Sequence, residues 1–197
     1  MAFSPQQQQM ILGLARATIR RELGDAQAGE PELHDPILRS PAGCFVTLHS
    51  LLSRRLRGCM GRLDSGDALA DVVEEMSHAV LDDPRFRDTP VTLEELPELE
   101  LEVSVLSPLA AAANATDFDL LTHGIYLHCA GETGCFLPQV ARETGWDKQH
   151  LLQRLCAEKM GLPPDAWQRP DAKLYRFTVD IIGPEPFVNT APQSPPS

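Results

Sequence analysis

The chain has 197 residues, of which 43% are hydrophobic, and its formal net charge is −11 with a pI near 4.9. This size and apolar content suit one globular domain, or one domain with an appended lobe, without covalent staples. The negative charge disfavours nucleic acid and anionic membranes as partners, and no apolar run approaches the roughly 18 residues of a membrane span. Five cysteines, an odd number, without a signal peptide lead us to expect a reducing, cytoplasmic location.

The first half of the chain contains two expected helices and three expected strands. Ser4-Pro5 predicts the start of a helix that ends near Gly24, because serine caps helices and proline favours their first position. A hairpin is predicted from two β-rich segments, 43–49 and 56–63, and a helix follows from Asp67 to about Leu81. The clearest strand is 99–106, where Leu101, Val103 and Val105 alternate with Glu100, Glu102 and Ser104.

The second half predicts a further hairpin, from 123–129 and 133–137, around Gly131-Glu132. Two helices are expected next, over 138–144 and 147–160, and a closing strand over 173–182. The strands do not alternate regularly with long helices, as they do in doubly wound folds. The sequence therefore predicts an α+β fold, with a mixed or mostly antiparallel sheet flanked by helices.

The segment Leu56-Arg-Gly-Cys-Met-Gly61 is the first candidate site. Gly58 and Gly61 permit another group to approach closely, and Arg57 shares a strand face with Cys59, where its charge favours the thiolate. A nucleophilic thiol also needs a proton acceptor. His123, at the start of a strand, is the best candidate, and Glu102 is placed to orient it. Two structural alternatives stay open for Cys59: a small buried hydrophobe, or a residue that lines a ligand site.

Two further polar residues have both a structural and a binding interpretation. Asp83-Pro84-Arg85-Phe86 predicts a turn in which Asp83 caps and Phe86 fills the core, while Arg85 is free to bind a carboxylate or phosphate. Gln139 falls in the first turn of an expected helix, where it either holds an anion or belongs to an ordinary helix start.

No metal or cofactor is expected. His123, His128, Cys129 and Cys135 are close in sequence, but strand alternation puts His128 on the opposite face from His123 and Cys129, and no ligand-spacing motif occurs. Phosphate-binding loops, dinucleotide fingerprints, zinc-protease and serine-hydrolase motifs are also absent from the sequence. The arginines around the hexapeptide form either a basic patch or a solvated strand face: Arg54, Arg55, Arg57 and Arg62.

An ordered series of motifs across residues 8–185 resembles the AMMECR domain family, in bacteria and archaea the "protein A" of the AmmeMemoRadiSam system. The motifs are GCFVTL (43–48), LRGCMG (56–61), DPRF (83–86), LEVSVLSP (101–108), HG (123–124), FLPQVA (136–141), GWD (145–147), LC (155–156), GL (161–162) and Trp167. The resemblance implies a fold of two lobes, one larger and one smaller, and it leaves residues 1–7 as an extension. The proline-rich composition of the end of the chain predicts a disordered tail over 186–197. In the family, isoleucine is usual where this chain has Met60, a swap that conserves volume.

The resemblance also implies association with a Memo-like protein and a radical SAM enzyme, and it marks residues 56–61 as the functional centre. We therefore expect a cytosolic enzyme or thiol carrier that acts with these partners on a small molecule, with Cys59 as nucleophile or carrier, His123 moving protons and Glu102 orienting it. A non-catalytic adaptor that uses the same cleft for a protein or metabolite is the alternative. A nucleic-acid-linked regulator is a third possibility, which the charge of −11 disfavours.

Overall fold

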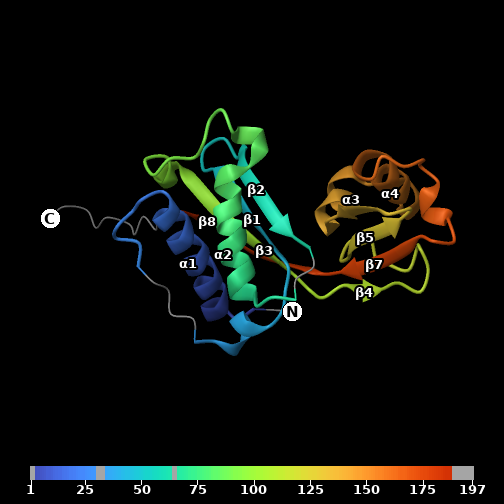
Figure 1. Cartoon of the computed structure of the whole chain (residues 1–197), viewed down its shortest axis with the longest axis horizontal. Coiled ribbons are helices and arrows are strands. Elements are labelled where there is room, and N and C mark those ends of the chain that lie inside the picture. The colour runs from blue at the N-terminus through green and yellow to red at the C-terminus, as the bar shows by residue number, and fades with distance from the viewer. Residues whose placement is uncertain (1–2, 30–33, 64–65, 188–197) are drawn as a thin grey trace. The chain divides into compact units, whose positions relative to one another are not determined.

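The computed structural model describes residues 3–29, 34–63 and 66–187, and the chain divides into two compact units (Figure 1). The larger unit combines the described residues up to Val105 with those from Asp180 onward, and the inserted unit is Leu106–Val179. Each unit has its own sheet and its own hydrophobic core. None of the helices in the described ranges has the apolar run that a membrane span requires.

The larger unit is built on a four-stranded sheet in the order β2-β1-β3-β8. Its strands are β1 (Cys44–Ser50), β2 (Leu56–Arg62), β3 (Leu99–Leu106) and β8 (Val179–Pro186). β1 runs antiparallel to both β2 and β3, and β2 is an edge strand. This position of β2 matters because it carries the hexapeptide 56–61.

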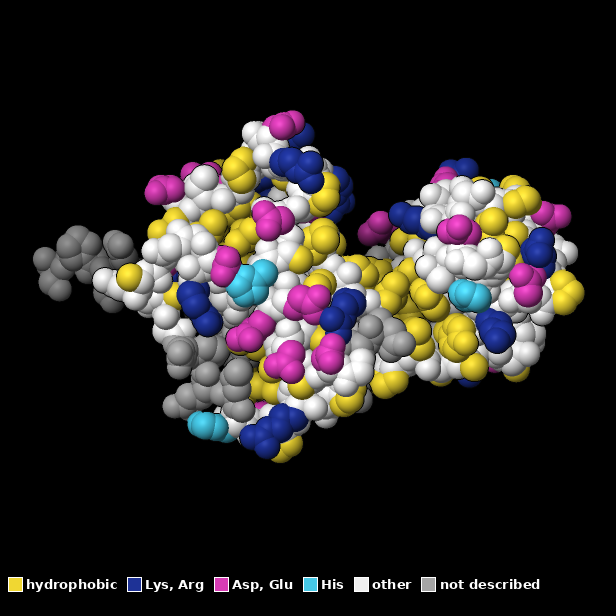
Figure 2. Space-filling model, in the orientation of Figure 1, with side chains coloured by type: hydrophobic (Ala, Val, Ile, Leu, Met, Phe, Trp, Pro, Cys, Tyr) yellow, Lys and Arg dark blue, Asp and Glu magenta, His cyan; other side chains and the backbone are white. Residues whose placement is uncertain are grey.

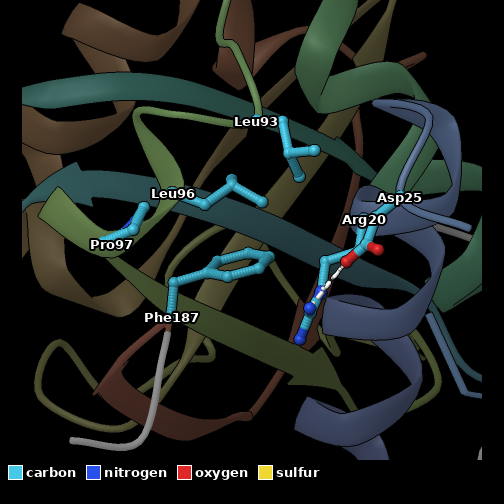
Figure 3. Close-up of a pocket in the computed structure, with 6 residues that line it drawn as sticks. All are labelled: Arg20, Asp25, Leu93, Leu96, Pro97 and Phe187. Atoms are coloured by element: carbon cyan, nitrogen blue, oxygen red, sulfur yellow. Dashed lines mark hydrogen bonds and ion pairs between the residues drawn. The ribbon is translucent and has the colours of Figure 1, made fainter. Parts of the chain in front are cut away.

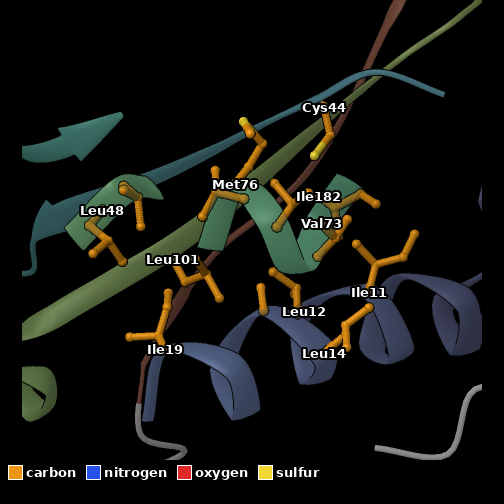
Figure 4. Close-up of a cluster of buried hydrophobic side chains, with 14 of the residues drawn as sticks. Ile11, Leu12, Leu14, Ile19, Cys44, Leu48, Val73, Met76, Leu101 and Ile182 are labelled. Atoms are coloured by element: carbon orange, nitrogen blue, oxygen red, sulfur yellow. The ribbon is translucent and has the colours of Figure 1, made fainter. Parts of the chain in front are cut away.

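Two helices, α1 (Pro5–Glu22) and α2 (Leu69–Ala79), supply the rest of this core (Figure 4). Ser4 caps α1 as predicted, in a reciprocal capping box with Gln7. Leu101, Val103 and Val105 of β3 are buried in the core, which confirms the predicted alternation of this strand. The other face of the sheet therefore carries Glu100, Glu102 and Ser104.

The inserted unit has a second four-stranded sheet, in the order β4-β7-β5-β6. Its strands are β4 (Ala110–Ala111), β5 (Gly124–Cys129), β6 (Glu132–Phe136) and β7 (Lys173–Phe177). The β5–β6 hairpin turns at Ala130 and Gly131, both with positive φ (53° and 81°), one residue earlier than the sequence predicts. Helices α3 (Pro138–Thr144) and α4 (Lys148–Arg154) complete this unit, and α4 continues into a π-helical turn, Leu155–Lys159.

The predicted α+β class with antiparallel strands is confirmed, but the strands form two sheets. The prediction of one closing strand over 173–182 is wrong, because the segment divides at Thr178 into β7 of one sheet and β8 of the other. Short 3-10 turns connect the elements: Pro36–Arg39, Val80–Asp82, Pro84–Phe86, Leu96–Glu98 and Ala166–Gln168. Most of the predicted tail, residues 188–197, lies outside the described residues, as do residues 1–2 of the predicted extension.

Candidate functional site

Cys59, Thr47 and Glu102 form one row across three strands of the larger unit. Thr47 on β1 lies opposite Cys59 on β2 and opposite Glu102 on β3. Residues that are directly opposite in antiparallel strands point to the same face, so all three side chains lie on the face away from the core. The Thr47 hydroxyl donates a hydrogen bond to the Cys59 sulfur, Oγ1 to Sγ, at 3.3 Å. The row therefore places a hydroxyl between a thiol and a carboxylate.

The backbone of Cys59 faces the open edge of the sheet, where side chains replace a fifth strand. Its N–H donates to Oδ2 of Asp83 at 2.9 Å, and its carbonyl accepts from the Arg85 guanidinium at 3.1 Å. An unpaired strand edge is otherwise free to pair with other chains. Asp83 and Arg85 thus seal the edge of β2 at the cysteine.

Asp83 and Arg85 are also paired with each other. The Arg85 Nε and terminal nitrogen contact the two carboxylate oxygens at 3.0 and 2.6 Å, and Asp83 caps the short turn by accepting from the Arg85 N–H at 3.0 Å. The side chain of Asp83 is only 2% exposed, and hydrogen bonds from Arg85 hold its pKa well below the usual range. The predicted capping role of Asp83 is confirmed.

The prediction that Phe86 fills the core is wrong, because Phe86 is only half-buried. Its ring lies under two guanidinium groups, with the Cζ atoms of Arg57 and Arg85 at 5.6 and 5.7 Å from the ring centroid. The turn after Pro84 directs the ring to these cations. Phe86 therefore belongs to the surroundings of the candidate site.

The charge of Arg57 is compensated by Glu95. Its guanidinium makes a bidentate pair with that carboxylate, at 2.5 and 2.7 Å, and donates to the Thr89 carbonyl at 3.1 Å. Arg57 lies at the irregularity in the β1–β2 register, where Gly58 pairs with Leu48 and Leu56 pairs with His49. The pKa of Arg85 is raised mainly by its hydrogen bond to Asp83.

Both glycines of the hexapeptide are closely packed. A Cβ at Gly58 would lie 2.8 Å from the Val80 carbonyl oxygen, and a Cβ at Gly61 would lie 2.0 Å from the Phe45 ring. Gly58 faces the end of α2, whereas Gly61 admits an aromatic ring over the strand on the face of Cys59. The sequence requirement for glycine at 58 and 61 is thus steric.

Two candidate residues belong to the inserted unit, whereas Cys59 and Glu102 belong to the larger one. His123 closes a turn with Asp119. The ring Nδ1 of His123 accepts from the backbone N–H of Asp119 at 2.9 Å, and the backbone N–H of His123 donates to the Asp119 carbonyl at 3.0 Å. Gln139 lies in the first turn of α3, as predicted, and within the described residues its buried Oε1 has no hydrogen-bond partner. The row of Cys59, Thr47 and Glu102 therefore includes neither His123 nor Gln139.

Sequence reasoning did not identify Thr47, Glu95 or Glu100 as site residues. Thr47 has a sequence signal, since it alternates with the core residues Val46 and Leu48 and so must face the cysteine side. Glu100 has a similar signal from its position two residues before Glu102 on β3. Glu95 has no such signal, because its contact with Arg57 spans 38 residues and depends on the tertiary fold.

The described cavities lie elsewhere in the molecule. One, of about 250 Å³, has apolar walls from Leu93, Leu96 and Phe187 and the Arg20–Asp25 ion pair at its side (Figure 3). Residues 57–59 do not line this cavity or two others of the described residues, and the expected cleft around them stays a prediction.

The arginines near the hexapeptide are largely neutralised. Arg54 pairs with Glu100, Arg57 with Glu95, and Arg62 with Asp67 and Glu75. Acidic and basic side chains are also interspersed over the α1–α2 face (Figure 2). These pairs favour the solvated-face interpretation over a basic patch. Within the described ranges, no three His, Cys, Asp or Glu side chains are grouped so that they could hold a metal ion.

Comparisons with known proteins agree on one family. Residues 12–182 match the family model described as AMMECR1. A Thermococcus gammatolerans protein is 36% identical over 187 residues, covering 90% of each chain, and a Methanocaldococcus jannaschii protein is 36% identical over 164 residues, covering 77% of each. The crystal structure of an uncharacterised Pyrococcus horikoshii protein is similar with a TM-score of 0.74 at 34% identity, covering 88% of this chain and 89% of that one. The chain belongs to the AMMECR1 family.

Proposed function

We propose that this AMMECR1-family protein uses the Cys59 thiol as a nucleophile or as a carrier of a small molecule, on the polar face of the larger unit's sheet. The observation that carries the proposal is the hydrogen bond from Thr47 Oγ1 to Cys59 Sγ, at 3.3 Å, in a row that ends at Glu102. A hydroxyl donor stabilises the sulfur anion, which is the reactive form of cysteine.

The hydrogen bonds that hold the backbone of Cys59 favour a functional role for this residue over a role in packing alone. Edge strands fray more readily than central strands, yet Asp83 and Arg85 hold both the N–H and the carbonyl of Cys59. A reactive group gains from such support, because its geometry is set before a substrate arrives. Cys59 is a partly exposed residue, as is Cys135, whereas Cys44, Cys129 and Cys156 are buried.

In this proposal Cys59 attacks or carries the substrate, Thr47 positions the sulfur, and Glu102 accepts or orients a proton. His123 keeps a candidate role only as a proton donor, through Nε2, because a neutral ring whose Nδ1 accepts the Asp119 N–H carries its own proton on Nε2. The expected partners are a Memo-like protein and a radical SAM enzyme, as the family resemblance implies. The cysteines are all free, which supports a reducing location such as the cytoplasm.

The test is the rate of iodoacetamide alkylation at each cysteine of the folded protein, followed by peptide mass spectrometry at several pH values. Cys59 is expected to react fastest. Cys44 and Cys135 are expected to react slowly, because burial raises the pKa of both thiols to about 12. A Cys59→Ser variant locates the reactive thiol. The proposal is wrong if Cys59 reacts no faster than Cys44 and Cys135 across the pH range.

A binding-only adaptor is the second candidate, and one observation favours it. Arg57, which the sequence predicts to activate the thiol, has its charge compensated by Glu95. An adaptor predicts that Cys59→Ala leaves binding to a purified Memo-like protein intact, whereas Arg55→Glu, a charge reversal at an exposed position beside the hexapeptide, weakens it. Calorimetric titration of the two variants separates these outcomes.

A further inference from the structure

The charged groups around Cys59 leave one carboxylate without a cationic partner. Three guanidinium groups near the hexapeptide are each paired, Arg54 with Glu100, Arg57 with Glu95 and Arg85 with Asp83. Glu102 accepts a hydrogen bond only from the Ser104 hydroxyl, at 3.3 Å, and no lysine or arginine of the described chain pairs with it. The row of Cys59 therefore ends in an uncompensated negative charge.

A second carboxylate on the same face has an oxygen without a partner. Glu100 lies two residues before Glu102 on β3, so both side chains point away from the core. Its side chain is only 5% exposed, and its Oε2 pairs with Arg54. Its Oε1 is buried and accepts no hydrogen bond from any described residue. A buried acceptor without a donor is costly, so this oxygen marks a place where an N–H group from outside the chain would be stabilised.

We propose that the polar face beside Cys59 binds a ligand with a positively charged, N–H-donating end, of the alkylammonium class, between Glu102 and the free oxygen of Glu100. This inference rests on the proposed function, and it names the substrate class that the thiol would meet. A carboxylate or phosphate ligand is disfavoured, because Arg54, Arg57 and Arg85 already bind carboxylates of the chain. The ammonium end would lie on β3, two strands away from the sulfur in the row.

Three methanethiosulfonate reagents of different charge test the charge preference at Cys59: the cationic aminoethyl, the neutral methyl and the anionic sulfonatoethyl compounds. In each reaction the thiolate attacks the divalent sulfur of the reagent. A disulfide forms, the thiosulfonate S–S bond breaks and methanesulfinate leaves. The thiol proton goes to solvent. Each rate constant is divided by that of 2-mercaptoethanol with the same reagent, which removes intrinsic reactivity.

The wild-type protein is expected to prefer the cationic over the anionic reagent by about tenfold or more, since the uncompensated Glu102 carboxylate and the free oxygen of Glu100 lie on the face of the incoming group. Glu102→Gln, which keeps the shape and removes the charge, is expected to lower this ratio at least about threefold. Glu100→Gln is expected to lower it as well. Asp71→Asn, an exposed change on α2 in the same unit, alters the net charge equally and controls for the long-range field of this acidic protein.

The outcomes separate the two proposals. The proposed ligand class is wrong if the ratio of cationic to anionic reagent rates is near one, or if Asp71→Asn lowers this ratio as much as Glu102→Gln does. The proposal that Cys59 is a reactive thiol is wrong if Cys59 does not react with the neutral reagent. If Glu100→Gln does not fold because Arg54 loses its partner, Glu102→Gln decides alone, since Glu102 is half-exposed and has no ion pair to lose in the described chain.

Discussion

The carboxylate of Asp83 accepts a hydrogen bond from the backbone N–H of Cys59 at 2.9 Å, and this contact joins two motifs that are 24 residues apart in sequence. Arg85 completes the connection by donating to the Cys59 carbonyl at 3.1 Å. The side chains of the DPRF segment therefore take the place of a neighbouring strand at the edge of β2. The Arg85 guanidinium already binds the Asp83 carboxylate and the Cys59 carbonyl, and this makes Arg85 a poor candidate for binding a free anion.

Replacement of Asp83 is expected to destabilise the larger unit. Asp83→Asn keeps the size of the side chain but removes the charge that binds Arg85. At this position, where the side chain is only 2% exposed, an amide oxygen is also a weaker hydrogen-bond acceptor than a carboxylate. We expect a loss of about 2–3 kcal/mol in the free energy of unfolding, measured by urea denaturation. Asp82→Asn, at an exposed neighbouring position, is the control and should change stability by less than about 0.5 kcal/mol.

The same pair predicts a pH dependence of stability. Arg85 lowers the pKa of Asp83 in the folded state, below the value of about 3.9 in an unfolded chain. Unfolding at acid pH therefore takes up a proton, so the contribution of the pair is complete above about pH 5 and is lost as the pH falls further. The stability difference between wild type and Asp83→Asn should be constant near neutrality and should shrink below about pH 4. A difference that is unchanged at low pH contradicts this assignment.

The Arg57–Glu95 pair predicts an asymmetry between two variants. The double variant Arg57→Leu/Glu95→Gln removes the pair without changing the net charge, so it should change the alkylation rate of Cys59 less than about twofold. Glu95→Gln alone frees the guanidinium and should raise the rate several-fold. Stopped-flow alkylation of the single and double variants measures the effect. A large loss of rate in the double variant would restore the direct activation by Arg57 that the sequence predicts.

Alanine at three glycines is expected to have opposite effects. Gly58→Ala and Gly61→Ala should each cost about 1–3 kcal/mol in unfolding free energy, because a Cβ would lie 2.8 Å from the Val80 carbonyl oxygen or 2.0 Å from the Phe45 ring. Gly13→Ala, in the middle of α1 with nothing within 4 Å of the new Cβ, should stabilise by about 0.5–1 kcal/mol. Thermal and urea denaturation check the three signs together.

Thr47 is expected to act on Cys59 through its hydroxyl. Thr47→Val preserves the shape and removes the hydrogen bond to the sulfur, so the alkylation rate of Cys59 should fall by about tenfold. Thr47→Ser retains the hydroxyl and should recover most of the rate. Equal rates in the valine and serine variants would show that the hydroxyl contributes only packing. Circular dichroism of each variant verifies the fold.

The sequence determined much of the local structure. Ser4-Pro5 defines the start of α1, and the alternation in 99–106 defines which residues of β3 enter the core, because capping and strand periodicity depend on neighbours in the chain. The motif 56–61 was located for the same reason, since two glycines and an arginine around one cysteine are a local pattern. The ordered motifs also indicated the family that the comparisons show.

Only the tertiary structure decided how these segments combine. Residues 173–182 have continuous strand character, and pairing partners distant in sequence divide them between two sheets. In the same way, nothing near Arg57 in sequence predicts that Glu95 neutralises it, and nothing near Cys59 predicts that Asp83 holds its N–H. Hydrogen bonds and ion pairs of this kind depend on distances between segments, which the chain sets only when the larger unit has folded.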